Sequence, residues 1–256
     1  MRIHSIFRAT ITLLSLALWE QALAAEFVIV GPRQMGMGGA GVAVTTDALA
    51  TYWNPAGLAM TQTVDIRIVG GGQAIARLGI ADAINDLENF NPNDTSSANI
   101  AKAQDIANRI NQPGANTSFN GAAGLYIKGH FGEHAFGFNI SDIPTGGGFV
   151  STPVTATVSG STVNITGAMA VRAMEARQAA FSYAYAFADK TFSIGVTAKI
   201  LQGAAYNGTQ NLQGGQDIKL SDSLGKATIS TTYGIDVGAI YRPSSWLRFG
   251  VVAKDL

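Results

Sequence analysis

Two stretches near the end of the chain alternate between apolar positions and small or polar positions. One face of residues 228–242 carries Ile229, Thr231, Tyr233, Ile235, Val237, Ala239 and Tyr241, and the other carries mostly serine, threonine, glycine and aspartate. In residues 246–256, Leu247, Phe249, Val251 and Ala253 alternate with Arg248, Gly250 and Lys254. Successive side chains of a β-strand point to opposite sides. The pattern therefore predicts two strands, each with one oily face.

The same period of two recurs upstream and predicts seven strands in total. They are residues 63–75, 119–132, 134–142, 169–188, 190–206, 228–242 and 246–256. Short turns at 132–133, 189–190 and 243–245 alternate with long connections at 76–118, 143–168 and 207–227. In this interpretation residues 144–167 are an excursion from a loop, with a small Thr/Val hairpin bent at Ser159-Gly160-Ser161.

Residues 79–111 follow a different period. Ile80, Ile84 and Leu87 repeat at the spacing of one helix face, as do Ile100, Ala103, Ala107 and Ile110. Asn91-Pro92-Asn93-Asp94 separates the two runs, Ser96 or Ser97 can cap the second, and Pro113-Gly114 ends it. A pair of helices is expected between the first two strands.

Composition connects this pattern to a membrane. Only 13% of the 256 residues are charged and the mean hydropathy is +0.18, yet no internal run of about 18 apolar residues predicts a membrane helix. A transmembrane barrel spreads its apolar residues, because lipid touches every second residue. The fold class predicted is all-β, an antiparallel transmembrane β-barrel with an N-terminal glycine-rich segment and a helical insertion. A secreted soluble β-sandwich is the weaker alternative.

The number of strands is odd, whereas bacterial single-chain barrels normally have an even number. We therefore expect the N-terminal part of a longer barrel, or a truncated product. The alternative is a complete eight-stranded barrel that uses the hairpin at 153–167 as wall.

The first 24 residues have the composition of a secretory signal peptide. Arg2, His4 and Arg8 form a basic start, residues 9–19 are apolar, and Ala22-Leu23-Ala24 offers a cleavage site. A buried N-terminal helix is the alternative. Export together with amphipathic strands predicts location in a Gram-negative outer membrane. The predicted organisation is a signal peptide at 1–24, a glycine-rich segment at 25–62, and a barrel portion at 63–256 with its helical insertion at 79–111.

Residues 36–41, Gly-Met-Gly-Gly-Ala-Gly, match the dinucleotide-binding fingerprint, and Phe27-Val28-Ile29-Val30 resembles a preceding strand. That fingerprint requires a glycine turning directly off the strand and a βαβ unit around it. Residues 32–35 intervene and no βαβ alternation follows, so a nucleotide site is not expected.

A different resemblance carries further. The signal peptide, the Gly-rich segment, Asp47-Ala48, Asn54-Pro55-Ala56 and the strands after them resemble the FadL-like outer-membrane family. Residues 31–39, the helical insertion and the strand at Gly195-Val196-Thr197 resemble its relatives, the plasmid conjugative-transfer TraF-like proteins. The resemblance implies transport of hydrophobic compounds past a segment folded into the lumen as a hatch. By resemblance, the hatch residues are Gly36, Gly38, Gly39, Gly41, Asn54, Pro55 and Ala56. A complete FadL-like barrel has more strands than this chain supplies.

Residues that support catalysis are scarce. The chain has no cysteine, and its three histidines include His130 and His134 beside a predicted turn, where exposure is more plausible than metal binding. No catalytic triad, metal site or cofactor site is expected, and the protein is not predicted to be an enzyme. Charged residues predicted to face the lumen, where they could contact the hatch or a polar solute, are Arg67, Lys128, Lys199, Asp236, Arg242 and Arg248, together with Lys254.

Two functions follow from these observations. The first is passage of hydrophobic or small solutes through a hatch-plugged lumen. The second is a non-transporting envelope component that supports conjugative transfer or surface assembly. The partners expected are outer-membrane lipid and lipopolysaccharide, a hydrophobic ligand, and envelope proteins contacted through external loops. A net charge of zero gives no indication of nucleic-acid binding.

Overall fold

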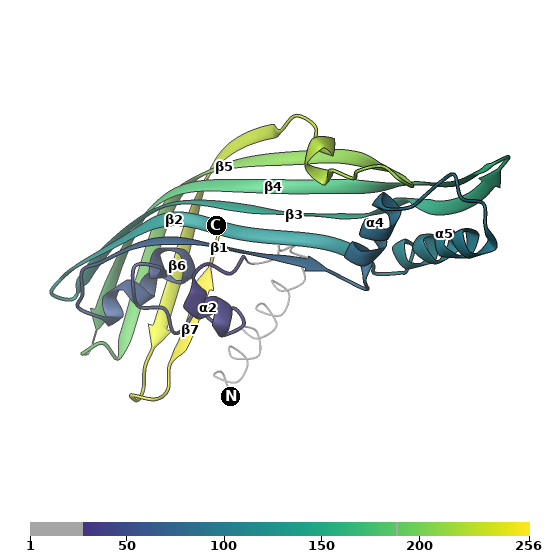
Figure 1. The fold of residues 1–256 in the computed structure, drawn as a ribbon. Helices are drawn as coiled ribbons and strands as arrows, with labels where there is room; N and C mark the ends of the chain where they lie inside the picture. Colours follow the sequence, from purple (N-terminus) through teal and green to yellow (C-terminus); the bar gives the residue numbers. More distant parts are fainter. Residues whose placement is uncertain (1–27, 188) are drawn as a thin grey trace, which may run out of the picture.

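The computed structural model describes residues 28–187 and 189–256, so the predicted signal peptide lies outside the described residues. Seven strands form one antiparallel sheet in the order in which they occur along the chain, with β1 and β7 at its two edges (Figure 1). The strands are β1 (Asp65–Ala76), β2 (Asn116–Phe131), β3 (His134–Ser159), β4 (Thr162–Phe187), β5 (Phe192–Gln213), β6 (Thr228–Tyr241) and β7 (Phe249–Ala253). The sheet curls into a half-barrel. The predicted antiparallel β class and the count of seven strands are confirmed.

Several predicted bounds are wrong. Residues 144–167 are not a separate excursion, because β3 and β4 run through them as one long hairpin that turns at Gly160. Strand β5 continues to Gln213, into the predicted loop, and a short 3-10 helix, η2 (Leu220–Ser223), follows. Strand β7 is shorter than the range 246–256. Within the described residues no eighth strand is present, so the hairpin at 153–167 extends two existing strands.

The two faces of the sheet differ as the alternation predicts. On the convex face large apolar side chains are exposed across the strands; examples are Ile68, Phe138, Phe181, Val196, Ile235 and Val251. The concave face carries small or polar side chains, and Ser182, Ala184, Ser193 and Thr197 are all buried there. Tyr126 is fully buried on the concave side.

The predicted helices exist as α4 (Ile80–Glu88) and α5 (Ser97–Ile110), and the hydroxyl of Ser96 accepts a hydrogen bond from the backbone N–H of Asn99 at 3.3 Å. They pack at the far end of the long β3–β4 hairpin (Figure 1). The hydrophobic core that they form with the strands includes Ile80, Leu87, Ile106, Ile110, Val154, Ile165, Met169 and Leu212. We call these helices, together with residues 143–159 of β3, 162–176 of β4 and 203–213 of β5, the distal extension.

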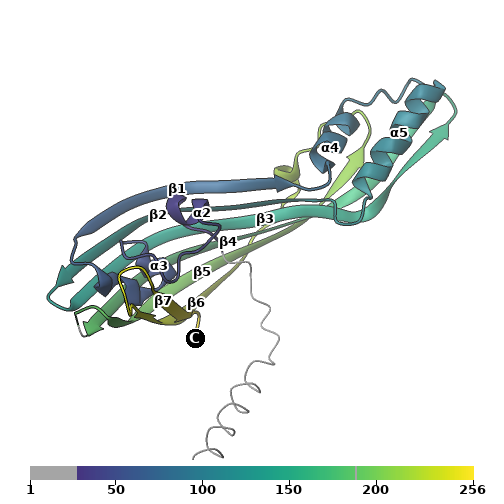
Figure 2. The ribbon, with the colours of Figure 1, turned by 90° about the horizontal axis from the view of Figure 1, so that it is seen from below.

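Residues 28–62, the N-terminal segment, lie on the concave face at the other end of the sheet (Figure 2). They contain α2 (Pro32–Gly36), α3 (Ala50–Trp53) and the 3-10 helix η1 (Pro55–Met60). Residues 28–30 are not a strand, and no βαβ unit surrounds the glycine-rich residues that follow. In the part of the chain that the structure describes, no helix combines the length and the hydrophobicity needed to cross a bilayer.

Candidate functional site

A row of very small residues crosses the concave face where the N-terminal segment rests. Ala135, Ala184, Gly195 and Gly238 lie opposite one another on β3, β4, β5 and β6, and all four are buried. A Cβ atom added to Gly195 would lie 2.5 Å from the carbonyl carbon of Pro55 and from the amide nitrogen of Ala56. Side chains are therefore absent where η1 begins, and its backbone lies directly on the backbone of the sheet.

Three more glycines make room for the same segment. A Cβ on Gly137 would lie 2.4 Å from Thr51 Cγ2, and one on Gly238 would lie 2.0 Å from Asn54 Oδ1. On β7, a Cβ on Gly250 would lie 2.7 Å from the Cα of Ala43. Together with Gly195, these glycines of β3, β5, β6 and β7 line a seat that spans five neighbouring strands, β3 to β7.

Asn54 connects the segment to the strands at the far edge. Its side-chain oxygen accepts a hydrogen bond from the backbone N–H of Ala56 at 3.1 Å, which caps η1. Its side-chain nitrogen lies 3.1 Å from the carbonyl oxygen of Val42 and 3.2 Å from those of Ala239 and Val251. The two amide hydrogens are thus shared among three carbonyl groups, two of which belong to β6 and β7.

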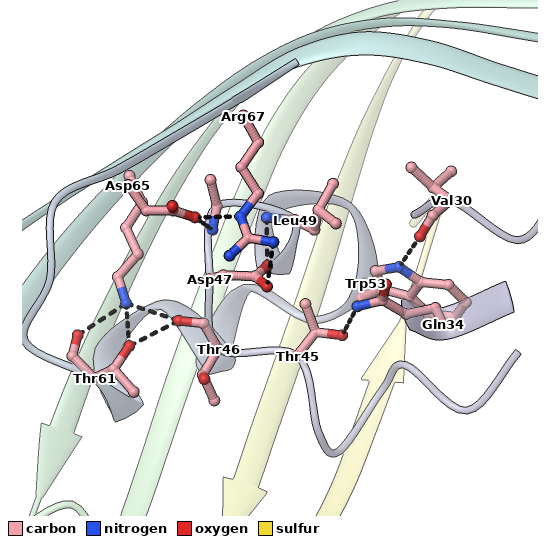
Figure 3. A network of polar contacts seen from close by, with 12 residues as sticks. Val30, Gln34, Thr45, Thr46, Asp47, Leu49, Trp53, Thr61, Asp65 and Arg67 are labelled. Carbon is pink, nitrogen blue, oxygen red and sulfur yellow. Dashed lines mark hydrogen bonds and ion pairs between the residues drawn. The ribbon is translucent and has the colours of Figure 1, made fainter. Parts of the chain in front are cut away.

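Aromatic side chains fold the segment back on itself. Trp53 is 1% exposed and its indole N–H donates to the carbonyl oxygen of Val30 at 2.9 Å (Figure 3). A Cβ on Gly41 would lie 2.1 Å from the ring of Trp53, so only glycine fits beside it. Tyr52 donates its hydroxyl to the carbonyl oxygen of Val28 at 2.8 Å. Burial raises the pKa of Tyr52, which keeps this donor protonated.

Lys128 of β2 holds the opposite end of the segment. Its side chain is fully buried, and Nζ donates to the carbonyl oxygens of Thr46 and Thr61 at 2.8 Å each and to the Thr61 hydroxyl at 2.6 Å. That hydroxyl in turn donates to the carbonyl oxygen of Thr46 at 2.8 Å. All three donors of the ammonium are satisfied by the N-terminal segment, so the charge is buried without an unmet hydrogen bond.

A second group of charges joins the segment to β1. Arg67 contacts Asp47 of the segment at 3.2 Å and Asp65 of its own strand at 2.8 Å (Figure 3). Asp65 also accepts from the backbone N–H of Ala48 at 2.8 Å. Figure 3 shows these three charged residues meeting at the point where the segment leads into α3.

At the other edge of the sheet, two cations flank β7: Arg248 precedes the strand and Lys254 follows it. Lys254 donates to the carbonyl oxygen of Tyr52 at 2.7 Å and lies 4.0 Å from the centre of its ring. Arg248 donates to the carbonyl oxygen of Ala43 at 3.4 Å. Behind them, Lys199 contacts Asp236 at 2.6 Å and Asp255 at 2.7 Å. The segment is therefore bonded to both flanks of the half-barrel.

The residues assigned to a hatch by resemblance divide into two groups. Gly41, Asn54, Pro55 and Ala56 are buried among the contacts described above. Gly38 and Gly39 have φ of 64° and 88°, so they supply the turn that ends α2. Gly36 is exposed, and a Cβ there would meet nothing within 4 Å.

Among the charged residues predicted to face the lumen, Arg67, Lys128, Lys199, Asp236, Arg248 and Lys254 all lie on the concave face or contact the N-terminal segment. Arg242 lies just after β6, where its backbone N–H donates to Thr191. His134 contacts the Tyr183 hydroxyl at 2.8 Å. No group of three metal-binding side chains occurs in residues 28–187 and 189–256.

None of the seat glycines Gly137, Gly195, Gly238 and Gly250 was predicted from the sequence to contact the N-terminal segment. The signal that could have found them is parity, because each falls on the small or polar side of its strand. Because of these glycines, the N-terminal segment has close backbone contacts with the centre of the sheet in addition to its polar contacts at both edges. These contacts together hold the segment in place. The geometry is that of a brace across the inside of the sheet.

Comparison with known proteins identifies the family of the chain. No curated protein and no solved structure matches the sequence. A family model described as "F plasmid transfer operon, TraF, protein" matches residues 51–256, which include most of α3, all of η1 and the seven strands of the described residues. The chain therefore belongs to the family of F plasmid transfer operon TraF proteins.

Proposed function

We propose that this chain is an outer-membrane component of a conjugative transfer system, with strands that cross the bilayer and an N-terminal segment that braces them. In this role it is not an enzyme and needs no cofactor. Its partners are membrane lipid around the convex face and envelope proteins at the distal extension. The observation that carries the proposal is the oily band on the convex face.

The length of the apolar stretch in each strand supports the proposal. Outward apolar positions run over residues 179–187 in β4, 192–200 in β5 and 233–241 in β6, about nine residues in each, and a tilted transmembrane strand needs about 9–11. Aromatic residues form a row at one end, where Phe187, Phe192, Tyr241 and Phe249 lie opposite one another. At the other end the next outward row is polar, with Asp142, Arg177, Gln202 and Thr231. Such borders are typical of membrane barrels.

The distal extension supports a contact role. From Asp142 to the turn at Gly160, β3 continues for about 18 residues, which is roughly 60 Å at about 3.3 Å per residue. The helices α4 and α5 pack at the far part of this hairpin and give it a core of its own. A stiff arm of this length could present a surface to partner proteins well beyond the bilayer.

Membrane embedding predicts opposite behaviour for two positions on β5. The chain has no cysteine, so a single nitroxide label can be attached at Val196→Cys in the band and at Thr209→Cys in the distal extension. In reconstituted vesicles we expect the label at 196 to collide with oxygen, which concentrates in lipid, and to be shielded from a water-soluble nickel complex. The label at 209 should show the reverse in the same electron paramagnetic resonance measurement. Equal nickel access at both positions would contradict the proposal.

Solute passage is the second candidate function, and one observation favours it. A gap of about 230 Å³ separates the segment from β1; it is lined by Ile29, Met35, Val69 and the glycines at 70–72. A hydrophobic solute could enter there if the segment moved. The bracing contacts oppose such movement, because breaking them leaves the buried ammonium of Lys128 and several buried carbonyl groups without their hydrogen-bond partners.

A cross-link separates the two functions. The double variant Thr51→Cys, Gly137→Cys is expected to form a disulfide, since a Cβ built at residue 137 would lie close to the side chain of Thr51. If the segment is a fixed brace, the oxidised and reduced forms should support plasmid transfer equally in a mating assay. If it is a hatch, uptake of a labelled hydrophobic compound should fall on oxidation and return on reduction. The Thr51→Cys single variant is the control for oxidation itself.

A further inference from the structure

The convex face has a hollow of about 710 Å³ at the border of the oily band that adjoins the distal extension, away from the N-terminal segment. It spans β2 to β6 and is lined by Ala123, Gly124, Leu125, Ile140, Ser141, Asp142, Arg177, Gln178, Ala179, Ile200, Gln202 and Thr231. No contact described above uses its outward-facing residues. Its position, half in the oily band and half in the polar row, makes it amphipathic.

The floor of the hollow is apolar. Leu125, Ile140, Ala179 and Ile200 lie opposite one another on four neighbouring strands. The small, exposed side chain of Ala179 lies between two isoleucines, each about half exposed. The result is a trough, with Ala179 at its lowest point, that could hold a hydrocarbon chain.

The upper rim is charged. Arg177 contacts Glu175 at 2.6 Å and Asp142 at 3.6 Å, and the side chains of Arg177 and Asp142 remain 60% and 41% exposed. Two carboxylates and one guanidinium give the rim a net charge of minus one. The guanidinium has five N–H donors, and its contact with Glu175 uses only its Nε and Nη2 atoms.

We propose that this hollow binds a diacyl phospholipid with a phosphoethanolamine headgroup. The inference rests on the membrane placement proposed above and adds a specific lipid site to it. One acyl chain lies in the trough at Ala179, the phosphate accepts from the remaining donors of Arg177, and the ammonium donates to Asp142. Both signs of charge on the rim are then matched. A purely anionic headgroup would leave the carboxylates facing like charge.

Phosphatidylcholine is the discriminating competitor. Its quaternary ammonium has the same charge as that of phosphatidylethanolamine but no N–H to donate to Asp142. We expect native mass spectrometry of the full chain, released from nanodiscs that contain both lipids, to show phosphatidylethanolamine retained about fivefold over phosphatidylcholine, as for one charge-assisted hydrogen bond at a partly exposed site. Equal retention would overturn the proposal, and so would preferential retention of phosphatidylglycerol from nanodiscs that contain it together with phosphatidylethanolamine.

Matched variants locate the site. Asp142→Asn should abolish the preference, and Arg177→Gln should lower the retention of both lipids, because both carry the phosphate. Asp86→Asn, which removes a carboxylate paired with Arg109 on the distal helices, should leave both retention and preference intact. Ala179→Phe should fill the trough and reduce lipid retention, whereas Ala198→Phe on the same face, outside the hollow, should not. A preference that persists in Asp142→Asn and Ala179→Phe would show that the lipid binds elsewhere.

Nanodisc insertion itself separates the two levels of the argument. Insertion without any lipid preference would refute the hollow as a lipid site and leave the membrane placement standing. Failure of the folded chain to insert into any lipid would refute both.

Discussion

Replacement of Trp53 by alanine is expected to lower the free energy of unfolding by about 3–5 kcal/mol, the range for removing a large buried aromatic side chain. Trp53 is 1% exposed and packs with Val30, Leu49, Tyr52 and Tyr126 in the core between the N-terminal segment and the sheet. The substitution also leaves the carbonyl oxygen of Val30 without its indole donor. Urea unfolding in detergent, followed by circular dichroism, measures the change.

Trp246 provides the matched control. It lies between β6 and β7 and is 82% exposed, so Trp246→Ala should change stability by less than about 0.5 kcal/mol, as expected for a surface position. Trp53→Phe should fall between the two, because it keeps most of the buried ring area and loses the hydrogen bond. If Trp53→Ala and Trp246→Ala were equally stable, the N-terminal segment would not be docked as described.

The second large effect is expected at Gly195. An alanine there would place Cβ 2.5 Å from two backbone atoms of η1, and backbone cannot rotate away as a flexible side chain can. We expect Gly195→Ala to destabilise the protein by about 1–3 kcal/mol, the usual range for overpacking, or to displace the segment. Limited proteolysis within residues 42–58 distinguishes the outcomes, because a displaced segment becomes cleavable.

Gly203 lies on the same strand and tests whether the effect is specific. A Cβ at 203 would meet only the carbonyl oxygen of Ser230, at 4.0 Å. Gly203→Ala therefore changes the strand's composition in the same way without touching the segment. Faster cleavage in Gly195→Ala than in Gly203→Ala is the expected result, and equal cleavage in both would count against the seat of glycines.

Much of the sheet could be predicted because each strand segment within the oily band is apolar on one face. The alternation in 190–206 and 228–242 is a direct consequence, and it located β5 and β6. It stopped being informative in the distal extension, where residues 207–213 of β5 are polar on most positions and 144–148 are largely glycine. Strands that lie beyond the band do not need an oily face, so their hydrophobic pattern disappears although their hydrogen-bonded ladder continues.

The site was less predictable than the fold, because its contacts join positions far apart in the sequence. The alternation placed Lys128 and Arg67 on the inner side of their strands, but nothing local indicates that Lys128 meets Thr46 and Thr61. Asn54 could be recognised as a turn former, whereas its contacts with Ala239 and Val251 depend on the curl of the whole sheet. A glycine that makes room for a distant backbone segment produces no periodic pattern in the sequence from which the contact could be predicted.

The double attachment of the N-terminal segment has a consequence for biogenesis. Asn54 reaches Val251 across 197 residues and Lys254 reaches Tyr52 across 202, so the earliest part of the described chain completes its bonds only with the latest. Contacts between residues so far apart in the sequence form slowly, because the chain loses the entropy of closing a large loop before the contacts contribute any stability. Residues 28–62 therefore remain loosely held until β7 has joined the sheet, and their docking would then fix the curvature of the sheet.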